Sequence, residues 1–100
     1  MALHLVIDFE WDAFKAAANL RQHAIPFEYA TRIFLDEHRL DDVDDRHDYG
    51  EARRLTLGRI EKRVFVVAYA VRADVIRLIS ARKANGRETR RYEALSTGSQ

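Results

Sequence analysis

The stretch Ile76-Arg77-Leu78-Ile79-Ser80-Ala81-Arg82-Lys83-Ala84 decides the fold, because it joins a strand pattern directly to a group of basic residues. Its apolar content predicts a strand over Val75 to Ala81. Between Val71 and Tyr92 the chain carries seven arginine and lysine residues against two acids, Asp74 and Glu88. This cationic stretch indicates that the ligand is an anionic polymer.

The opposite charge gathers upstream, where residues 36–48 hold seven acids against Arg39 and Arg46, so that the formal net charge of +1 hides a strong asymmetry. With few apolar residues, this segment predicts a solvated loop that leads toward Tyr49-Gly50. Its acids, with His38 and His47, suggest a metal site as the alternative. The segment lacks the ligand alternation and central glycine of an EF-hand, so we favour the loop.

Two more strands precede the deciding stretch. Alternating residues predict one strand over Arg53 to Leu57, and an almost unbroken apolar run predicts another over Val64 to Val71. Residues 58–62 supply a turn between them, and Ala73-Asp74 turns the chain back into the last strand. The pattern is typical of an antiparallel meander.

The helices are predicted at the two ends of the chain. After a first strand over Leu3 to Phe9, Asp12 is expected to cap a helix from Ala13 to about His23. Pro26 suits the first turn of a second helix that ends near residue 35. A closing helix is predicted from about Asn85 to residue 95, followed by a flexible tail over 96–100.

These elements predict an α+β fold in which an antiparallel sheet, made of the N-terminal strand and the three-strand meander, packs with two N-terminal helices and one C-terminal helix. The 100 residues make a single domain, 1–100. The absence of cysteine excludes disulfides and thiolate zinc sites. The apolar run at the N-terminus breaks at Asp8, too early for a signal peptide or a spanning helix, which predicts a cytoplasmic protein without membrane contact.

Two blocks of sequence resemble the BrnT family of bacterial type II toxins. The blocks and the residues between them that share in the resemblance are Phe9-Glu10-Trp11-Asp12, Lys15, Asn19, His23, Phe27, Ala30, Tyr49-Gly50-Glu51, Arg53, Arg72, Arg77, Ile79-Ser80-Ala81-Arg82, Ala84, Glu88 and Tyr92. The resemblance covers nearly the whole chain. The family commonly has Gly at the position of Ala24 and Thr at that of Ala70, and neither departure removes a charge.

This resemblance implies a RelE-like fold, a ribonuclease activity that halts translation, and a cognate antitoxin of the BrnA type, itself a ribbon-helix-helix DNA binder. We expect the antitoxin to bury the basic face made by the last strand and the closing helix. The sequence has no helix-turn-helix or ribbon-helix-helix pattern of its own, so DNA contact is expected only through the antitoxin. No cofactor or metal is expected.

Cleavage of RNA without a metal needs a base for the 2′-hydroxyl proton, cations for the phosphorane and an acid for the leaving 5′-oxygen. Arg77 and Arg82 are the candidates for charge stabilisation, with a structural ion pair as the alternative for Arg77. The acid-base candidates are His23, Lys15, Glu51 and Glu88. His23 has the alternative of closing the first helix, and Lys15 that of a solvated side chain.

The remaining candidates are residues that would bind RNA without taking part in proton transfer. Phosphate contacts are expected from Arg72, Lys83, Arg87 and Arg91, and base stacking from Tyr92 or Trp11. Packing between helix and sheet is the alternative for Tyr92, and a place in the core is the alternative for Trp11. The alternative function is a non-catalytic module that binds RNA or the antitoxin and acts as co-repressor within a DNA-bound complex.

Overall fold

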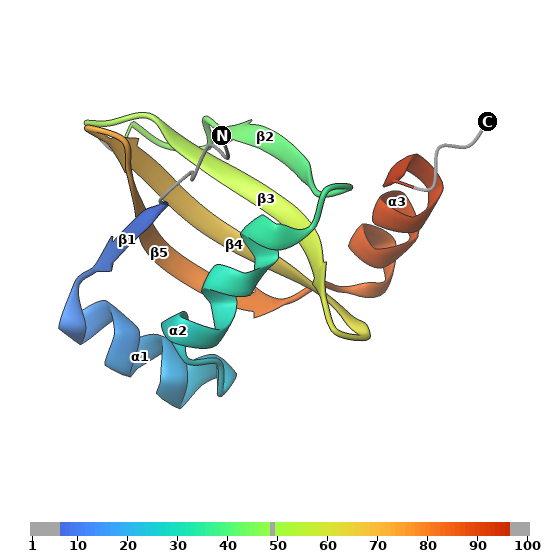
Figure 1. The fold of residues 1–100 in the computed structure, drawn as a ribbon, viewed down its shortest axis with the longest axis horizontal. Helices are drawn as coiled ribbons and strands as arrows, with labels where there is room; N and C mark the ends of the chain where they lie inside the picture. Colours follow the sequence, from blue (N-terminus) through green and yellow to red (C-terminus); the bar gives the residue numbers. More distant parts are fainter. Residues whose placement is uncertain (1–6, 49, 97–100) are drawn as a thin grey trace, which may run out of the picture.

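A mixed sheet of five strands organises this computed structural model, which describes residues 7–48 and 50–96 (Figure 1). The strand order is β1-β5-β4-β3-β2. The strands are β1 (Asp8–Trp11), β2 (Leu40–Asp44), β3 (Arg53–Ile60), β4 (Arg63–Arg72) and β5 (Val75–Lys83). The helices are α1 (Ala13–His23), α2 (Phe27–Ala30), the 3₁₀ helix η1 (Thr31–Leu35) and α3 (Gly86–Ser96). Within these described ranges, no helix has the length and apolar character needed to cross a membrane.

The α+β class is confirmed, but the prediction of a purely antiparallel sheet is wrong at one edge. β1 runs parallel to β5, with Asp8 opposite Val75 and Trp11 opposite Leu78. The chain leaves β1 through helices instead of a hairpin, which permits a parallel return. The predicted first strand began at Leu3, and residues 1–6 lie outside the described part of the chain, as do Tyr49 and tail residues 97–100.

The prediction of a solvated loop over residues 36–48 is also wrong, because β2 forms inside it and pairs antiparallel with β3. The acids of β2 are neutralised within the fold, so the strand forms although the segment has few apolar residues. Asp41 accepts hydrogen bonds from the Tyr69 hydroxyl at 2.5 Å, from Arg39 at 2.9 Å and from the Nε of Arg54. An acidic strand is stable where each carboxylate has such donors.

The meander of β3, β4 and β5 is confirmed, and its strands are longer than predicted. Gly58 lies within β3 instead of in the turn, and glycine suits this position because a Cβ there would stand 2.6 Å from Cγ1 of Ile33 in η1. The turn is made near Glu61, which has a positive φ of 56°. Ala73 and Asp74, with φ of 49° and 66°, form the tight turn between β4 and β5.

The two faces of the sheet are covered differently. α1, α2 and η1 cover one face, where Phe27, Ile33, Val67 and Leu78 form the main core. α3 lies at one end of the molecule (Figure 1), and its Tyr92 joins a smaller apolar cluster of residues on the other face. The rest of that second face has no helix over it within the described ranges.

The predicted helix ends are confirmed at α1. Asp12 accepts a hydrogen bond from the backbone N–H of Lys15 at 3.0 Å, and His23 is the last helical residue. Ala24 follows in the left-handed conformation, at φ 59°, and its N–H donates to the carbonyl of Leu20. α2 continues directly into η1, so together they span the second predicted helix.

Candidate functional site

A bulge in β5 places its two central arginines on the same face of the sheet. Arg77 and Arg82 are five residues apart, and in a regular strand an odd separation points side chains to opposite faces. The register shifts between Ala68 and Tyr69, which pair with Ser80 and Leu78, so Ile79 is the extra residue. As a result Arg77 lies beside Ala70 and Arg82 beside Val66, on the face of β4 that also carries Arg72. We call this surface, defined by Arg72, Arg77 and Arg82, the arginine face.

Each guanidinium of the arginine face is held by a carboxylate from a different element. The pairs are Arg72 with Glu51 at 2.7 and 2.9 Å, Arg77 with Glu10 of β1 at 3.0 Å, and Arg82 with Glu88 of α3 at 2.8 and 2.9 Å. The face is therefore a set of short charge-assisted hydrogen bonds in the free protein, and an incoming anion must exchange with these carboxylates.

The segment between β2 and β3 brings further charge to this face. The guanidinium of Arg46 donates two hydrogen bonds to Asp44, at 2.8 and 3.0 Å, and lies close enough to Arg82 for their like charges to repel. The Asp44 side chain is only 2% exposed. Glu51 lies near Arg53 and Arg77 as well as Arg72. All five strands, the segment between β2 and β3, and α3 thus contribute charged residues to one patch of the sheet.

Three carboxylates of this patch have a lowered pKa. The hydrogen bond from Arg72 lowers the pKa of Glu51, and that from Arg82 lowers the pKa of Glu88. Arg46 likewise lowers the pKa of Asp44. At neutral pH these groups therefore accept protons or hydrogen bonds and do not donate them.

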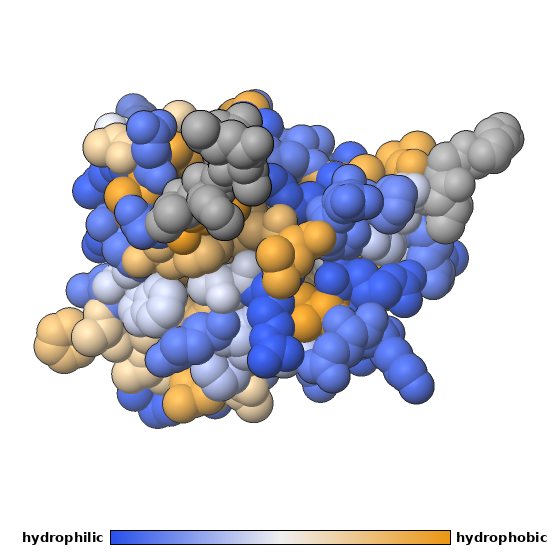
Figure 2. Space-filling model, viewed as in Figure 1, coloured by the Kyte–Doolittle hydropathy of each residue, from blue (hydrophilic) through white to orange (hydrophobic). Residues whose placement is uncertain are grey.

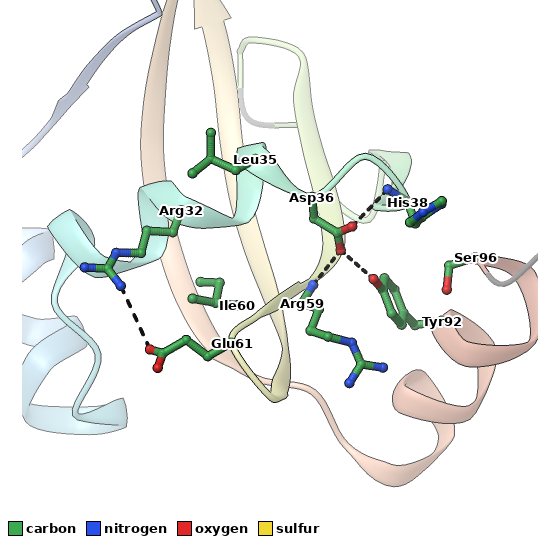
Figure 3. A pocket seen from close by; sticks show the side chains of 9 residues that line it. All are labelled: Arg32, Leu35, Asp36, His38, Arg59, Ile60, Glu61, Tyr92 and Ser96. Atoms are coloured by element: carbon green, nitrogen blue, oxygen red, sulfur yellow. Dashed lines mark hydrogen bonds and ion pairs between the residues drawn. The ribbon is translucent and has the colours of Figure 1, made fainter.

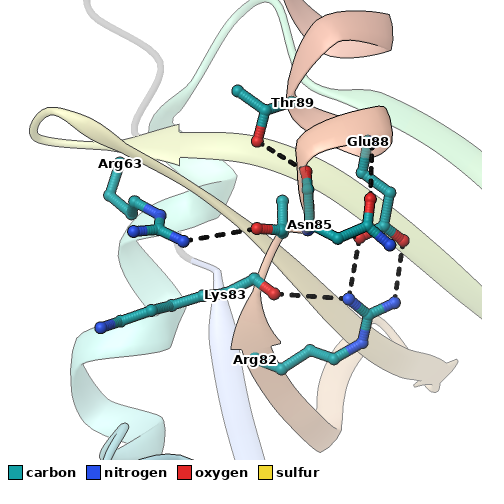
Figure 4. A network of polar contacts seen from close by, with 7 residues as sticks. Arg63, Arg82, Lys83, Asn85, Glu88 and Thr89 are labelled. Carbon is teal, nitrogen blue, oxygen red and sulfur yellow. Dashed lines mark hydrogen bonds and ion pairs between the residues drawn. The ribbon is translucent and has the colours of Figure 1, made fainter.

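Glu88 has a second, structural task at the start of α3 (Figure 4). It accepts a hydrogen bond from the backbone N–H of Asn85 at 2.9 Å, while Asn85 accepts one from the N–H of Glu88 at 2.8 Å. This reciprocal capping box begins the helix. Arg63 donates to the Ala84 carbonyl at 3.4 Å and ties the same corner to β4. The Arg82–Glu88 pair therefore joins the arginine face to the start of α3.

The acid-base candidates on α1 lie beside β5 but do not join this network. Asn19 is buried and accepts a hydrogen bond from the N–H of Ala81 at 2.9 Å, which fixes α1 along the edge of β5. Lys15 and His23 lie one turn to either side of Asn19, exposed and half-buried respectively. Within residues 7–48 and 50–96 neither side chain makes a hydrogen bond or ion pair.

Some of the RNA-binding residues predicted on α3 and just before it are exposed in the structure, and others are paired or buried. Lys83 and Arg87 are exposed, and Arg91 pairs with Asp42 of β2 at 3.1 Å. Tyr92 is only 4% exposed and donates to Asp36 at 2.5 Å, so its ring has no free face for a base and takes the packing role instead. Trp11 packs edge-on against Phe27 and belongs with the core.

Three residues of the site were not among those predicted: Glu10, Asp44 and Arg46. Glu10 lies in the Phe9-Glu10-Trp11-Asp12 block, but only the parallel pairing of β1 with β5 sets it opposite Arg77. Alternation within β2 could have signalled Asp44, had that segment been read as a strand. The described ranges hold no group of three or more His, Asp or Glu side chains arranged to hold a metal ion.

A comparison with known protein families identifies the family of the chain. The BrnT family profile, described as the ribonuclease toxin BrnT of type II toxin-antitoxin systems, matches residues 11–88. No curated protein matches the sequence. The matched range contains most of the chain, including Arg72, Arg77, Arg82 and Glu88. The chain therefore belongs to the BrnT family of ribonuclease toxins of type II toxin-antitoxin systems.

Proposed function

We propose that this toxin cleaves single-stranded RNA at the arginine face by attack of the 2′-hydroxyl on the adjacent phosphate. One observation carries the proposal: three guanidinium groups on one sheet surface each already hold a carboxylate at hydrogen-bonding distance. A phosphate offers oxygens of similar charge and spacing, so it takes the place of a carboxylate on the same fork of donors.

In this mechanism the 2′-oxygen bonds to phosphorus, the bond from phosphorus to the 5′-oxygen breaks, and a 2′,3′-cyclic phosphate and a 5′-hydroxyl result. Arg77 and Arg82 stabilise the extra negative charge of the phosphorane, and Arg72 holds a neighbouring phosphate. Guanidinium groups supply this charge at any physiological pH, so the step needs no divalent cation. The exposed Lys83 and Arg87, together with Arg91, are the residues proposed to contact the rest of the strand.

Glu51 is the proposed base that takes the proton of the 2′-hydroxyl. Its pKa is lowered by the hydrogen bond from Arg72, so it is ionised at neutral pH. Its side chain is 24% exposed, which leaves it open to a substrate. Glu88 is the poorer base, because it also caps α3. His23 and Lys15, along the edge of β5, are the candidates for the acid that protonates the 5′-oxygen.

The proposal extends to the cell. Cleavage of messenger RNA in the cytoplasm would inhibit translation, and a ribbon-helix-helix antitoxin of the BrnA type would restrain the toxin by placing its own carboxylates over the arginine face. RNA and antitoxin would then compete for one surface, and part of the antitoxin's affinity would weaken with salt. DNA contact would come through the antitoxin.

The test is cleavage of a single-stranded RNA by the purified protein in the presence of EDTA. We expect 2′,3′-cyclic phosphate ends, no cleavage of the same strand carrying 2′-deoxy sugars, and a large loss of rate in Glu51→Gln. If Glu51 is the base, the rate should not fall as the pH is lowered through about 6.5, as it would if a histidine were the base. Activity that stops on chelation, or products with 3′-hydroxyl ends, would contradict the mechanism.

A second candidate function is a non-catalytic module that binds RNA or the antitoxin within a DNA-bound repressor complex. The observation in its favour is that the arginines of the face are already neutralised within the chain. Binding needs only the cations, whereas cleavage also needs proton transfer. Under this alternative, Glu51→Gln and His23→Ala would leave growth arrest unchanged.

A further inference from the structure

A groove of about 690 Å³ lies outside the arginine face, between η1, the β3–β4 turn and the second half of α3 (Figure 3). Ile60 and Tyr92, which are 3% and 4% exposed, form its apolar floor. Leu35 stands at its rim with 80% of its surface exposed. Near the end of η1, apolar surface is visible among hydrophilic residues (Figure 2). An exposed aliphatic side chain beside an apolar hollow is typical of a protein-binding surface.

The cations of the groove are loosely held, unlike those of the arginine face. Arg32 lies 3.9 Å from Glu61, and Arg59 lies 3.6 Å from Glu93. Both distances exceed that of a normal hydrogen bond. Instead, Arg32 lies over the ring of Tyr29 and Arg59 over the ring of Tyr92, which positions both at the surface.

The acids of the groove, in contrast, are already engaged. Asp36 accepts hydrogen bonds from the Tyr92 hydroxyl, the N–H of Arg59 and the N–H of His38, at 2.5, 2.7 and 2.9 Å. Glu61 accepts one from the Tyr29 hydroxyl at 2.7 Å. The groove therefore presents available guanidinium donors around an apolar floor, and its complement is an apolar side chain flanked by carboxylates.

We propose that this groove anchors an acidic amphipathic segment of the antitoxin. The inference rests on the antitoxin that family membership implies, and it does not depend on the proposed cleavage chemistry. An apolar side chain of the segment packs against exposed Leu35, over the floor that Ile60 and Tyr92 form, and neighbouring carboxylates bind Arg32 and Arg59. The arginine face adjoins the first turn of α3 and the groove adjoins its later turns, so one partner lying along α3 reaches both.

The experiment measures the affinity of purified toxin variants for the antitoxin encoded beside the toxin gene, together with cleavage of single-stranded RNA. Leu35→Asp places a carboxylate at the rim of the groove. Arg32→Gln with Arg59→Gln removes both charges and keeps the stem of each side chain in place. Leu20→Asp on α1 is the matched control, because Leu20 is also an exposed leucine.

We expect Leu35→Asp to weaken antitoxin binding by about tenfold or more, because it replaces an apolar contact with a charge that must be desolvated and that repels the carboxylates of the segment. The double variant should bind more weakly at low salt, and its affinity should depend less on salt. The affinity of the Leu20 control and the RNA cleavage rate of all variants should stay at the wild-type level.

Unchanged affinity in both groove variants would overturn the proposal. Lost RNA cleavage with intact antitoxin binding would assign the groove to RNA instead. A wild-type protein that cleaves no RNA would refute the proposed function alone, since the binding assay reads the groove independently.

Discussion

The arginine face and the groove both present arginine side chains, which are tightly paired with carboxylates on the face and loosely paired in the groove. On the arginine face the ion pairs are short, at 2.7 to 3.0 Å; the Arg82–Glu88 pair is bidentate, and Arg72 donates two hydrogen bonds to one oxygen of Glu51. In the groove the two pairs are long, at 3.6 and 3.9 Å. An anion that enters the arginine face must displace a carboxylate, whereas one that enters the groove adds to what is there. Displacement of a carboxylate on the arginine face favours an anion whose charge rises during the reaction, as that of a phosphorane does. Binding in the groove without displacement favours a stable protein partner.

The largest expected effect comes from truncating the central cations of the arginine face. Arg77→Ala or Arg82→Ala should slow RNA cleavage by about 10²- to 10³-fold, which corresponds to roughly 3–4 kcal/mol of transition-state stabilisation. Single-turnover cleavage of a defined RNA measures this, with circular dichroism to confirm folding. Arg21→Ala, an exposed arginine of α1, is the control and should cleave normally. Wild-type rates in both folded variants would remove the arginine face from the mechanism.

The next effect concerns the support of the groove. Gly58→Ala should lower the free energy of unfolding by about 1–3 kcal/mol, because the added Cβ overpacks against buried Ile33 of η1. Urea denaturation measures the change. Since η1 ends at the rim of the groove, the folded variant should bind the antitoxin more weakly and cleave RNA at the normal rate. Stability equal to that of the wild type would show that η1 can shift without loss.

A smaller effect measures the structural task of Glu88. Its pKa in the folded protein is lowered from 4.5 by Arg82, so its contribution is present above that pH and is lost as the pH falls through the folded value. Glu88→Gln should therefore be less stable than the wild type by about 1 kcal/mol at pH 7 and nearly equal to it at low pH. Chemical denaturation at several pH values measures the difference. A constant difference at all pH values would mean that charge is not involved.

The smallest effect is expected from a substitution that should leave both the arginine face and the groove unchanged. Ala24→Gly should stabilise the protein by about 0.5 kcal/mol, because Ala24 has a left-handed conformation that suits glycine. Thermal unfolding measures this change, and cleavage and antitoxin binding should not alter. A destabilised variant would show that the entropy lost by glycine on folding outweighs the relief of strain.

The sequence predicts local elements well, because their signals are local. The cap at Asp12, the end of α1 at His23, the turn at Ala73-Asp74 and the extent of α3 depend on neighbouring residues alone, and all are confirmed. β2 was missed because its carboxylates are neutralised by arginines and a tyrosine distant in sequence. The formal charge of a segment does not indicate whether such partners are present elsewhere in the fold.

The site residues likewise include some that local sequence predicts and others that only the assembled sheet brings together. The concentration of arginines was visible in the sequence, and Arg72, Arg77 and Arg82 do share one face. A two-residue alternation would have separated Arg77 from Arg82, and only the bulge at Ile79 reunites them. The parallel pairing that sets Glu10 opposite Arg77 is likewise a property of the assembled sheet. Tyr92 has the composition of a stacking residue, but packing of α3 buries it.

The central claim is that RNA phosphates replace carboxylates on the arginine face. It is tested most directly by following the arginine Nε–Hε signals by NMR as a single-stranded 2′-O-methyl RNA is added, because this strand lacks the nucleophile and is not cleaved. We expect the signals of Arg72, Arg77 and Arg82 to shift with a common saturation curve. The signals of Arg32 and Arg59 should not shift. Shifts confined to Arg32 and Arg59, with the arginine face unmoved, would contradict it.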